Sequence, residues 1–189
     1  MSTISPTSHR LAASARERAR HDQSVPPSDW AFRYVAAAIR LCIGWVFLWA
    51  FLDKLLGLGH ETASKAAWVN GGHPTFGFLK LGTTGPFAGF YKGFAGATWA
   101  DWSFMLGLFA IGVGLMAGIA MGLSVIAGVT MLVLMWSAAL PPANNLFMDE
   151  HIIYGLTLVA LLLAGAGRTL GFGRRWEQLA VVRKNRWLS

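Results

Sequence analysis

The sequence predicts an all-α integral membrane protein, a four-helix bundle with a long outer loop that contains short interfacial segments. Hydrophobic residues make up 54% of the 189-residue chain and charged residues only 13%, about half the charged share of a typical soluble domain. The stretch from Phe104 to Leu140 contains no Asp, Glu, Lys, Arg or His. Because about 20 apolar residues cross the roughly 30 Å hydrocarbon layer once, this stretch predicts two crossings.

The other elements follow in chain order. From Val35 to Leu52 only Arg40 is charged, which predicts a first crossing that also serves as an uncleaved signal anchor. Glycines at 118 and 122 mark the turn inside the long apolar stretch, and Pro141-Pro142 ends the third helix. The predicted helices cover about residues 33–56, 102–118, 122–140 and 151–167, with an outer loop over 57–101.

The two ends of the chain are basic. Residues 1–29 read as a disordered tail, residues 30–168 as the transmembrane domain, and 169–189 as an amphipathic tail along the membrane surface. Both termini are therefore expected in the cytoplasm, with anionic lipid headgroups as partners. The same placement argues against nucleic acid as a partner, despite the net charge of +7. The flanking cations are Arg10, Arg16, Arg18, Arg20, Arg33, Arg168, Arg174, Arg175, Arg183, Lys184 and Arg186.

The outer loop is rich in aromatic residues and glycine, among them Trp68 and Trp99. Segments such as FGFLKLG and GPFAGFYKGFAG indicate short interfacial or re-entrant pieces. Either these aromatics only anchor the loop at the interface, or the loop has a function of its own. Gly114, Gly118 and Gly122, at four-residue spacing, are expected to serve close helix packing.

Ionisable groups near helix ends are the candidate site residues, since charges in lipid are costly. Arg40 either extends to the headgroups or faces the bundle interior, where it needs a carboxylate or carbonyl partner. His151 is the sharpest candidate, because a histidine exchanges protons near neutral pH and can bind a quinone-like carbonyl. The acidic residues at helix starts have a simpler interpretation as caps. The predicted catalytic residues are His151, Asp53 and Lys54, and the predicted cofactor or polar-site residues are Trp68, Asp149 and Glu150.

The sequence contains no pattern typical of a disulfide, a metal site or a nucleotide-binding site. The single cysteine, Cys42, forms no intrachain disulfide, and His60, His73 and His151 lack the spacing of metal ligands. There is no nucleotide-binding loop, because the segment GAGRTLG follows a membrane helix. We therefore expect no metal.

Several motifs resemble the DoxX family of bacterial membrane proteins. They are GWVFLWAFLDKLLGLG, AWVNGGHPTFGFL, PFAGFY, WADWSFMLGLFAIGVGL and MWSAALPPANNLFMDEHIIYGLTLVALLLAGAGRTLGFGRRWE. The resemblance runs from about Trp30 to the C-terminus. The DoxX family is itself similar to the DoxD-type subunit of thiosulfate:quinone oxidoreductase. It implies a four-helix protein of the bacterial inner membrane, coupled in some members to sulfur oxidation and quinone reduction. Its polar positions match Asp53, Lys54, Asp149, Glu150 and His151, and its outer loop matches Trp68, Gly71 and Pro74.

Three functions remain open. The leading hypothesis is a redox-associated membrane subunit, with quinone as a possible cofactor. The second is a non-catalytic subunit that assembles other membrane redox proteins, because the chain has no self-sufficient catalytic set. The third is a small-solute transporter, for which the sequence lacks the interrupted helices and inverted repeats typical of such folds.

Overall fold

The computed structural model describes residues 27–185, and within this range every regular element is helical, as predicted. The chain forms two units, residues 1–32 and 33–189. Residues 1–26, which make up most of the first unit and of the predicted tail 1–29, lie outside the described range. The packing below is that of the second unit.

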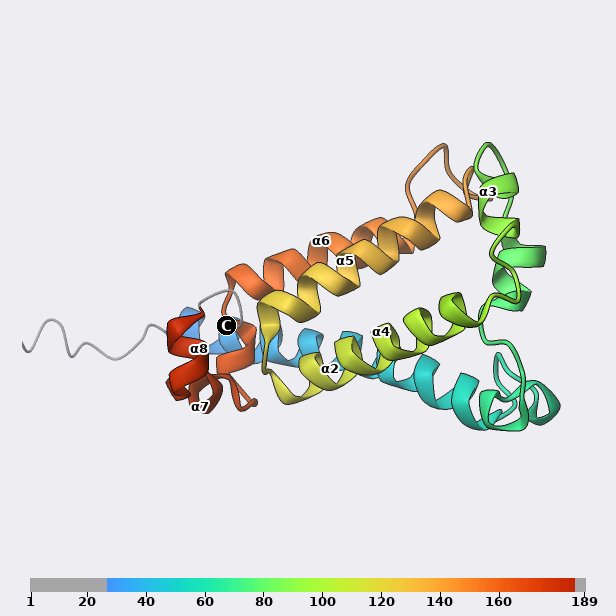
Figure 1. The fold of residues 1–189 in the computed structure, drawn as a ribbon. Helices are drawn as coiled ribbons and strands as arrows, with labels where there is room; N and C mark the ends of the chain where they lie inside the picture. The colour runs from blue at the N-terminus through green and yellow to red at the C-terminus, as the bar shows by residue number, and fades with distance from the viewer. Residues whose placement is uncertain (1–26, 186–189) are drawn as a thin grey trace, which may run out of the picture. The chain divides into compact units, whose positions relative to one another are not determined.

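Three helices are long and apolar enough to cross a membrane. They are α2 (Pro27–Leu56), α4 (Thr98–Ala117) and α5 (Met121–Ala138), shown in Figure 1. A fourth apolar helix, α6 (Glu150–Leu163), has 14 residues, fewer than the other three.

Two helices begin earlier than the sequence indicated. Helix α2 starts at Pro27 and not at residue 33, because proline is well suited to the first helical position and Asp29 lies in the first turn. Helix α4 starts at Thr98 and not at residue 102. The early start places Asp101 in its first turn, where a carboxylate is favoured by the helix dipole.

Two helices end earlier than predicted. Helix α5 stops at Ala138, two residues before the predicted end. Helix α6 stops at Leu163 and not at residue 167, because Gly165 adopts a left-handed conformation (φ 61°) that ends the helix. A short 3₁₀ turn, η4 (Ala166–Arg168), follows it.

Helices α2 and α4 run antiparallel and approach closely through two glycines. A Cβ on Gly112 would lie 2.8 Å from the backbone nitrogen of Leu48, and one on Gly44 would lie 3.0 Å from the Cβ of Leu115. The rings of Phe51 and Phe109 extend the contact, 5.1 Å apart. Small residues at both crossing points allow the two backbones to meet.

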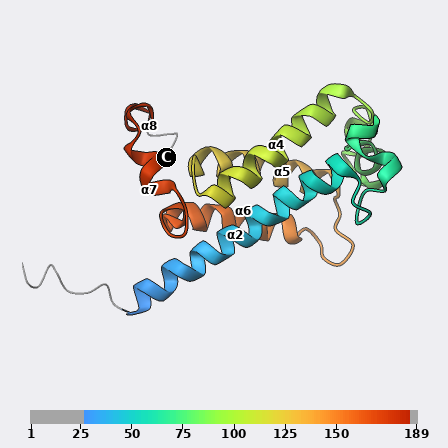
Figure 2. The same ribbon diagram turned by 90° about the horizontal axis from the view of Figure 1, so that it is seen from below.

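Helices α4, α5 and α6 complete the packing. The turn of residues 118–120 joins α4 to α5, and α5 and α6 lie side by side in both views (Figures 1 and 2). At the centre, a Cβ on Gly128 would contact Leu158, Ile111 and Phe47, one residue from each of the other three helices. The buried core consists of Ala36, Ile43, Phe47, Met105, Leu108, Ile111, Leu115, Met121, Val125, Leu132, Leu158, Leu161 and Ala166.

The connection between α2 and α4 contains short helical segments separated by turns. In chain order they are η1 (Ser64–Ala66), η2 (Trp68–Asn70), the π-helical η3 (Phe78–Gly82) and α3 (Ala88–Lys92). Tyr91 on α3 meets Ser137 on α5 through their hydroxyls at 2.5 Å. The segment is thereby attached to the bundle at the end of α5.

The C-terminal tail forms two short helices, α7 (Gly173–Gln178) and α8 (Ala180–Lys184), and not one amphipathic helix. Leu179 interrupts them in an extended conformation (φ −63°, ψ 135°). The bend accompanies the burial of Val182, an apolar side chain that would be exposed on an isolated surface helix. Residues 186–189 lie outside the described range.

Candidate functional site

The predicted site residues lie at the end of the bundle that holds Leu56, Thr98, Ala138 and Glu150, which we call the outer end. The opposite end, which holds Ala117, Met121 and Leu163, is called the inner end. Helices α2 and α5 finish at the outer end, and α4 and α6 begin there. Chain reversals between antiparallel helices thus gather polar residues that are far apart in the sequence.

His151 and Asp149 form a hydrogen-bonded pair at the start of α6. The Nδ1 atom of His151 lies 2.8 Å from Oδ2 of Asp149, and both side chains are largely buried. Asp149 also caps the helix, because its Oδ1 accepts the backbone N–H groups of His151 at 3.0 Å and Ile152 at 3.4 Å. The carboxylate therefore fixes both the helix start and the orientation of the imidazole ring.

Asp53 is buried, with 1% of its surface exposed. Its carboxylate accepts backbone N–H groups of the following loop, from His60 at 3.3 Å and from Glu61 at 3.1 Å. Its main-chain carbonyl accepts the N–H of Gly57 at 2.8 Å. A buried carboxylate needs such donors, so the geometry gives Asp53 the role of holding the loop after α2.

A second histidine–aspartate pair lies at the start of α4, and the sequence did not reveal it as a pair. Asp101 is 2% exposed and accepts three hydrogen bonds. They come from the Thr75 hydroxyl at 2.6 Å, from the Thr75 N–H at 3.0 Å, and from His73 through Nδ1 at 2.8 Å. Half of the His73 side chain is exposed (51%). The available signal was an acidic first-turn residue together with the loop motif GGHPT.

The remaining predicted residues are placed separately. The Trp68 ring packs edge-on against Trp102 on α4, with centroids 4.7 Å apart. Lys54 is partly buried and Glu150 is exposed. Within residues 27–185, no hydrogen bond, ion pair or ring contact links Asp53, Lys54 or Trp68 to the Asp149–His151 pair. The structure thus brings together Asp149 and His151 from the predicted set.

Arg40 is at the inner end and is fully buried (0% exposed). Of the two expected positions it takes the interior one, with carbonyl groups as partners. Nη1 donates to Leu115 and to Met116 (3.0 Å), and Nη2 donates to Thr169 (3.3 Å) and Leu170 (2.8 Å). Carbonyls in the last turn of a helix lack intrahelical donors, so Arg40 satisfies the end of α4 and ties it to the segment after α6.

The described residues contain no group of three or more His, Cys, Asp or Glu side chains that could hold a metal ion. The two histidine–aspartate pairs remain as the groups with acid–base chemistry. In each pair, a neutral histidine that donates from Nδ1 keeps the lone pair of Nε2 for another partner. A pair of this kind can give a proton to, or take one from, a small bound molecule.

Comparisons with known proteins identify no relative of this chain. No family model, no curated protein and no solved structure matches the chain.

Proposed function

We propose that the chain is a DoxX-like protein of the bacterial inner membrane that crosses the bilayer four times, with both termini in the cytoplasm. The fourth crossing is α6 together with its flanking residues. At the inner end, a Cβ on Gly167 would lie 2.7 Å from Met121 Cγ, at the start of α5. At the outer end, Nε1 of Trp136 donates to the Phe147 carbonyl at 2.7 Å. The segment 147–167 therefore extends along nearly the whole of α5, which supports a crossing of equal depth.

Labelling from outside the cell tests this topology. In a Cys42→Ala background, a membrane-impermeant maleimide should label Ser64→Cys in intact cells. It should label Ser5→Cys and Ser189→Cys only after the membrane is opened. Labelling of either terminal cysteine in intact cells would overturn the four-crossing arrangement.

We further propose that the protein acts as a redox-associated subunit whose outer end exchanges protons with a quinone. The supporting observation is the hydrogen bond of 2.8 Å between His151 and Asp149. Reduction of a quinone takes up two electrons and two protons, and the oxidation of two thiosulfate ions to tetrathionate releases two electrons. His151, once it has taken up a proton on Nε2 from water, would donate that proton to one quinone oxygen, and water would supply the second proton. Asp149 would hold the ring in place and stabilise the imidazolium form.

The surroundings of His151 suit a ligand that arrives from the lipid phase. Leu146, Phe147, Ile153 and Tyr154 all have exposed side chains close to it in the chain. Exposed apolar residues at the end of a membrane helix contact lipid, where quinones are dissolved. Asp53, whose carboxylate is occupied by loop amides, fits a positioning role in this proposal.

A purified preparation tests the redox proposal through thiosulfate-dependent reduction of a soluble quinone analogue, with and without candidate partner subunits. The variant His151→Ala should reduce the rate by roughly 10²–10⁴-fold, the contribution of one general acid. The matched control is His73→Ala, which removes the histidine of the other pair and should leave the rate within about twofold. Absence of both turnover and co-purified quinone in the native protein would exclude the catalytic version.

A non-catalytic assembly subunit is the second candidate. It is supported by exposed apolar side chains of the segment between α2 and α4, such as Leu81 and Phe90, and of the start of α4, such as Trp99. The buried Asp101 carboxylate holds this segment at Thr75, which gives a partner a defined surface. Crosslinking in the membrane should then capture one stable partner through Phe90 or Trp99. A monodisperse protein that purifies in mild detergent without a partner would contradict this function.

A further inference from the structure

Two adjoining hollows lie at the inner end, away from the proposed redox site. The first is about 300 Å³ in volume and the second about 240 Å³. They share the wall formed by Ala164, Gly165, Ala166 and Arg168. The two hollows differ in chemical character, and this difference suggests what occupies them.

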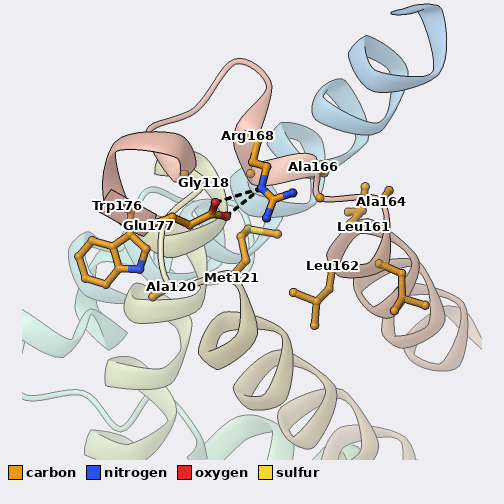
Figure 3. Close-up of a pocket in the computed structure, with 14 residues that line it drawn as sticks. Gly118, Ala120, Met121, Leu161, Leu162, Ala164, Ala166, Arg168, Trp176 and Glu177 are labelled. Carbon is orange, nitrogen blue, oxygen red and sulfur yellow. Dashed lines mark hydrogen bonds and ion pairs between the residues drawn. The ribbon is translucent and has the colours of Figure 1, made fainter. Parts of the chain in front are cut away.

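The smaller hollow is strongly basic. Arg33 from α2, Arg168 from η4 and Arg174 from α7 all line it, and no acidic residue does. Glu177, which lines the larger hollow, accepts hydrogen bonds from Nε of Arg168 at 2.9 and 3.2 Å (Figure 3). Within the described residues, Arg33 and Arg174 have no ion pair. The hollow therefore carries an excess of positive charge.

The larger hollow combines apolar side chains with the charged Arg168 and Glu177. Figure 3 shows Leu161 and Leu162 on one side and Trp176 on the other, with Met121 and the Arg168–Glu177 ion pair between them. The leucines belong to α6, which packs against α5 and which we propose to be the fourth crossing. A hydrocarbon chain could therefore enter this hollow from the lipid.

We propose that the two hollows together form a binding site for an anionic phospholipid. Its phosphate occupies the arginine-lined hollow, and the first part of an acyl chain lies over Met121, Leu161 and Leu162. Guanidinium groups bind phosphate oxygens through paired, charge-assisted hydrogen bonds. Basic pockets between membrane helices are suited to acidic lipid headgroups. A lipid with a net negative charge is selected because a zwitterionic headgroup adds a cation that the three arginines repel.

The site connects the start of α2 with the segment that follows α6, two parts of the chain that are distant in sequence. Arg33 lies near the start of α2, Arg168 follows α6, and Arg174 lies on α7. A bound phosphate would neutralise like charges that otherwise repel one another, so the lipid should also stabilise the inner end. This inference rests on the proposed membrane topology and is independent of the redox proposal.

Native mass spectrometry of the full chain in detergent tests the site, with dioleoyl phosphatidylglycerol and dioleoyl phosphatidylcholine added in parallel. Phosphatidylglycerol should be retained about tenfold better than phosphatidylcholine. The variant Arg33→Gln/Arg174→Gln should reduce this retention by about tenfold. The control Arg183→Gln/Lys184→Gln removes the same charge from exposed positions outside the hollow and should retain the lipid.

Competition identifies the source of the phosphate. Inorganic phosphate and glycerophosphoglycerol, which carry the anionic group without acyl chains, should fail to displace the lipid at millimolar concentration. Displacement by either would replace the lipid with a soluble phosphate as ligand and overturn the proposal. Equal losses in both double variants would also overturn it, because they would indicate diffuse surface attraction. Denaturant titration of each variant without added lipid verifies that its bundle is as stable as that of the native protein.

Discussion

The guanidinium of Arg40 donates a hydrogen bond of 2.8 Å to the main-chain carbonyl of Leu170, 130 residues further along the chain. The other η-nitrogen binds the last turn of α4 at Leu115 and Met116. One side chain from α2 thus joins the end of α4 to the segment that follows α6. A cation is also favoured at this position, because the carbonyl end of a helix carries partial negative charge.

Replacement of this side chain should destabilise the bundle. Arg40→Met keeps much of the volume but removes the donor of the Met116 and Leu170 carbonyls, while Leu115 keeps only the N–H of Gly118, so we expect a loss of about 2–3 kcal/mol. Denaturant titration of the protein in detergent measures this change. Arg33→Met, an exposed arginine of the same helix, is the control and should stay within about 0.5 kcal/mol. Equal stability of the two variants would refute the structural role of Arg40.

Glycine at the crossing of α2 and α4 should be irreplaceable. Gly112→Ala places a methyl group 2.8 Å from the backbone of Leu48, so we expect a loss of about 1–3 kcal/mol from forced separation of the helices. Gly155→Ala in α6 is the matched control, because nothing lies within 4 Å of its Cβ position. Alanine there should gain about 0.5–1 kcal/mol from helix propensity. A neutral Gly112→Ala variant would show that the two helices are not in close contact.

The buried Asp101 should protect the amide of Thr75. Asp101→Asn removes the charge from the acceptor of the Thr75 N–H and the His73 ring, at an expected cost of about 1–2 kcal/mol. Hydrogen exchange at the Thr75 amide should then accelerate about tenfold, since 1.4 kcal/mol corresponds to that factor. Asp149→Asn makes the same change in the other pair and should leave exchange at Thr75 as it is.

The loop after α2 should depend on Asp53 and not on its neighbour. Asp53→Ala removes the acceptor of the His60 and Glu61 amides, and their hydrogen exchange should rise at least about tenfold. Lys54→Gln changes the adjacent residue, which makes no hydrogen bond to this loop, and should leave both amides protected. Comparable exchange in the two variants would remove the organising role of Asp53.

Much of the helical architecture could be predicted from apolar run lengths. The stretch 104–140 had to divide in two because it exceeds one crossing, and it divides at Gly118, whose φ of 69° suits glycine. The first residues of the helices were harder to predict from the sequence. Thr98 and Trp99 precede the apolar run of α4, close to Asp101 and its tertiary contacts with Thr75 and His73. Such contacts leave no mark on local hydrophobicity.

The candidate site was predictable only where its partners are neighbours in sequence. Asp149 and His151 are two residues apart, and the N-cap position of Asp149 follows from its place before an apolar run. His73 and Asp101 are separated by 28 residues and a series of turns, so their pairing requires the three-dimensional path of the outer segment. The hydrogen-bond acceptors of Arg40 could not be predicted either, because they are main-chain carbonyls, which every residue type carries.

The hydrogen bonds of Arg40 to Thr169 and Leu170 also join parts of the chain that are synthesised at different times. Arg40 is translated with the first apolar helix, whereas two of its acceptors are translated about 130 residues later. Until the ribosome has released that last segment, the charge has only part of its final coordination. A nascent chain truncated before Thr169 would therefore leave the Arg40 guanidinium without two of its main-chain acceptors, a deficit that only the completed chain removes.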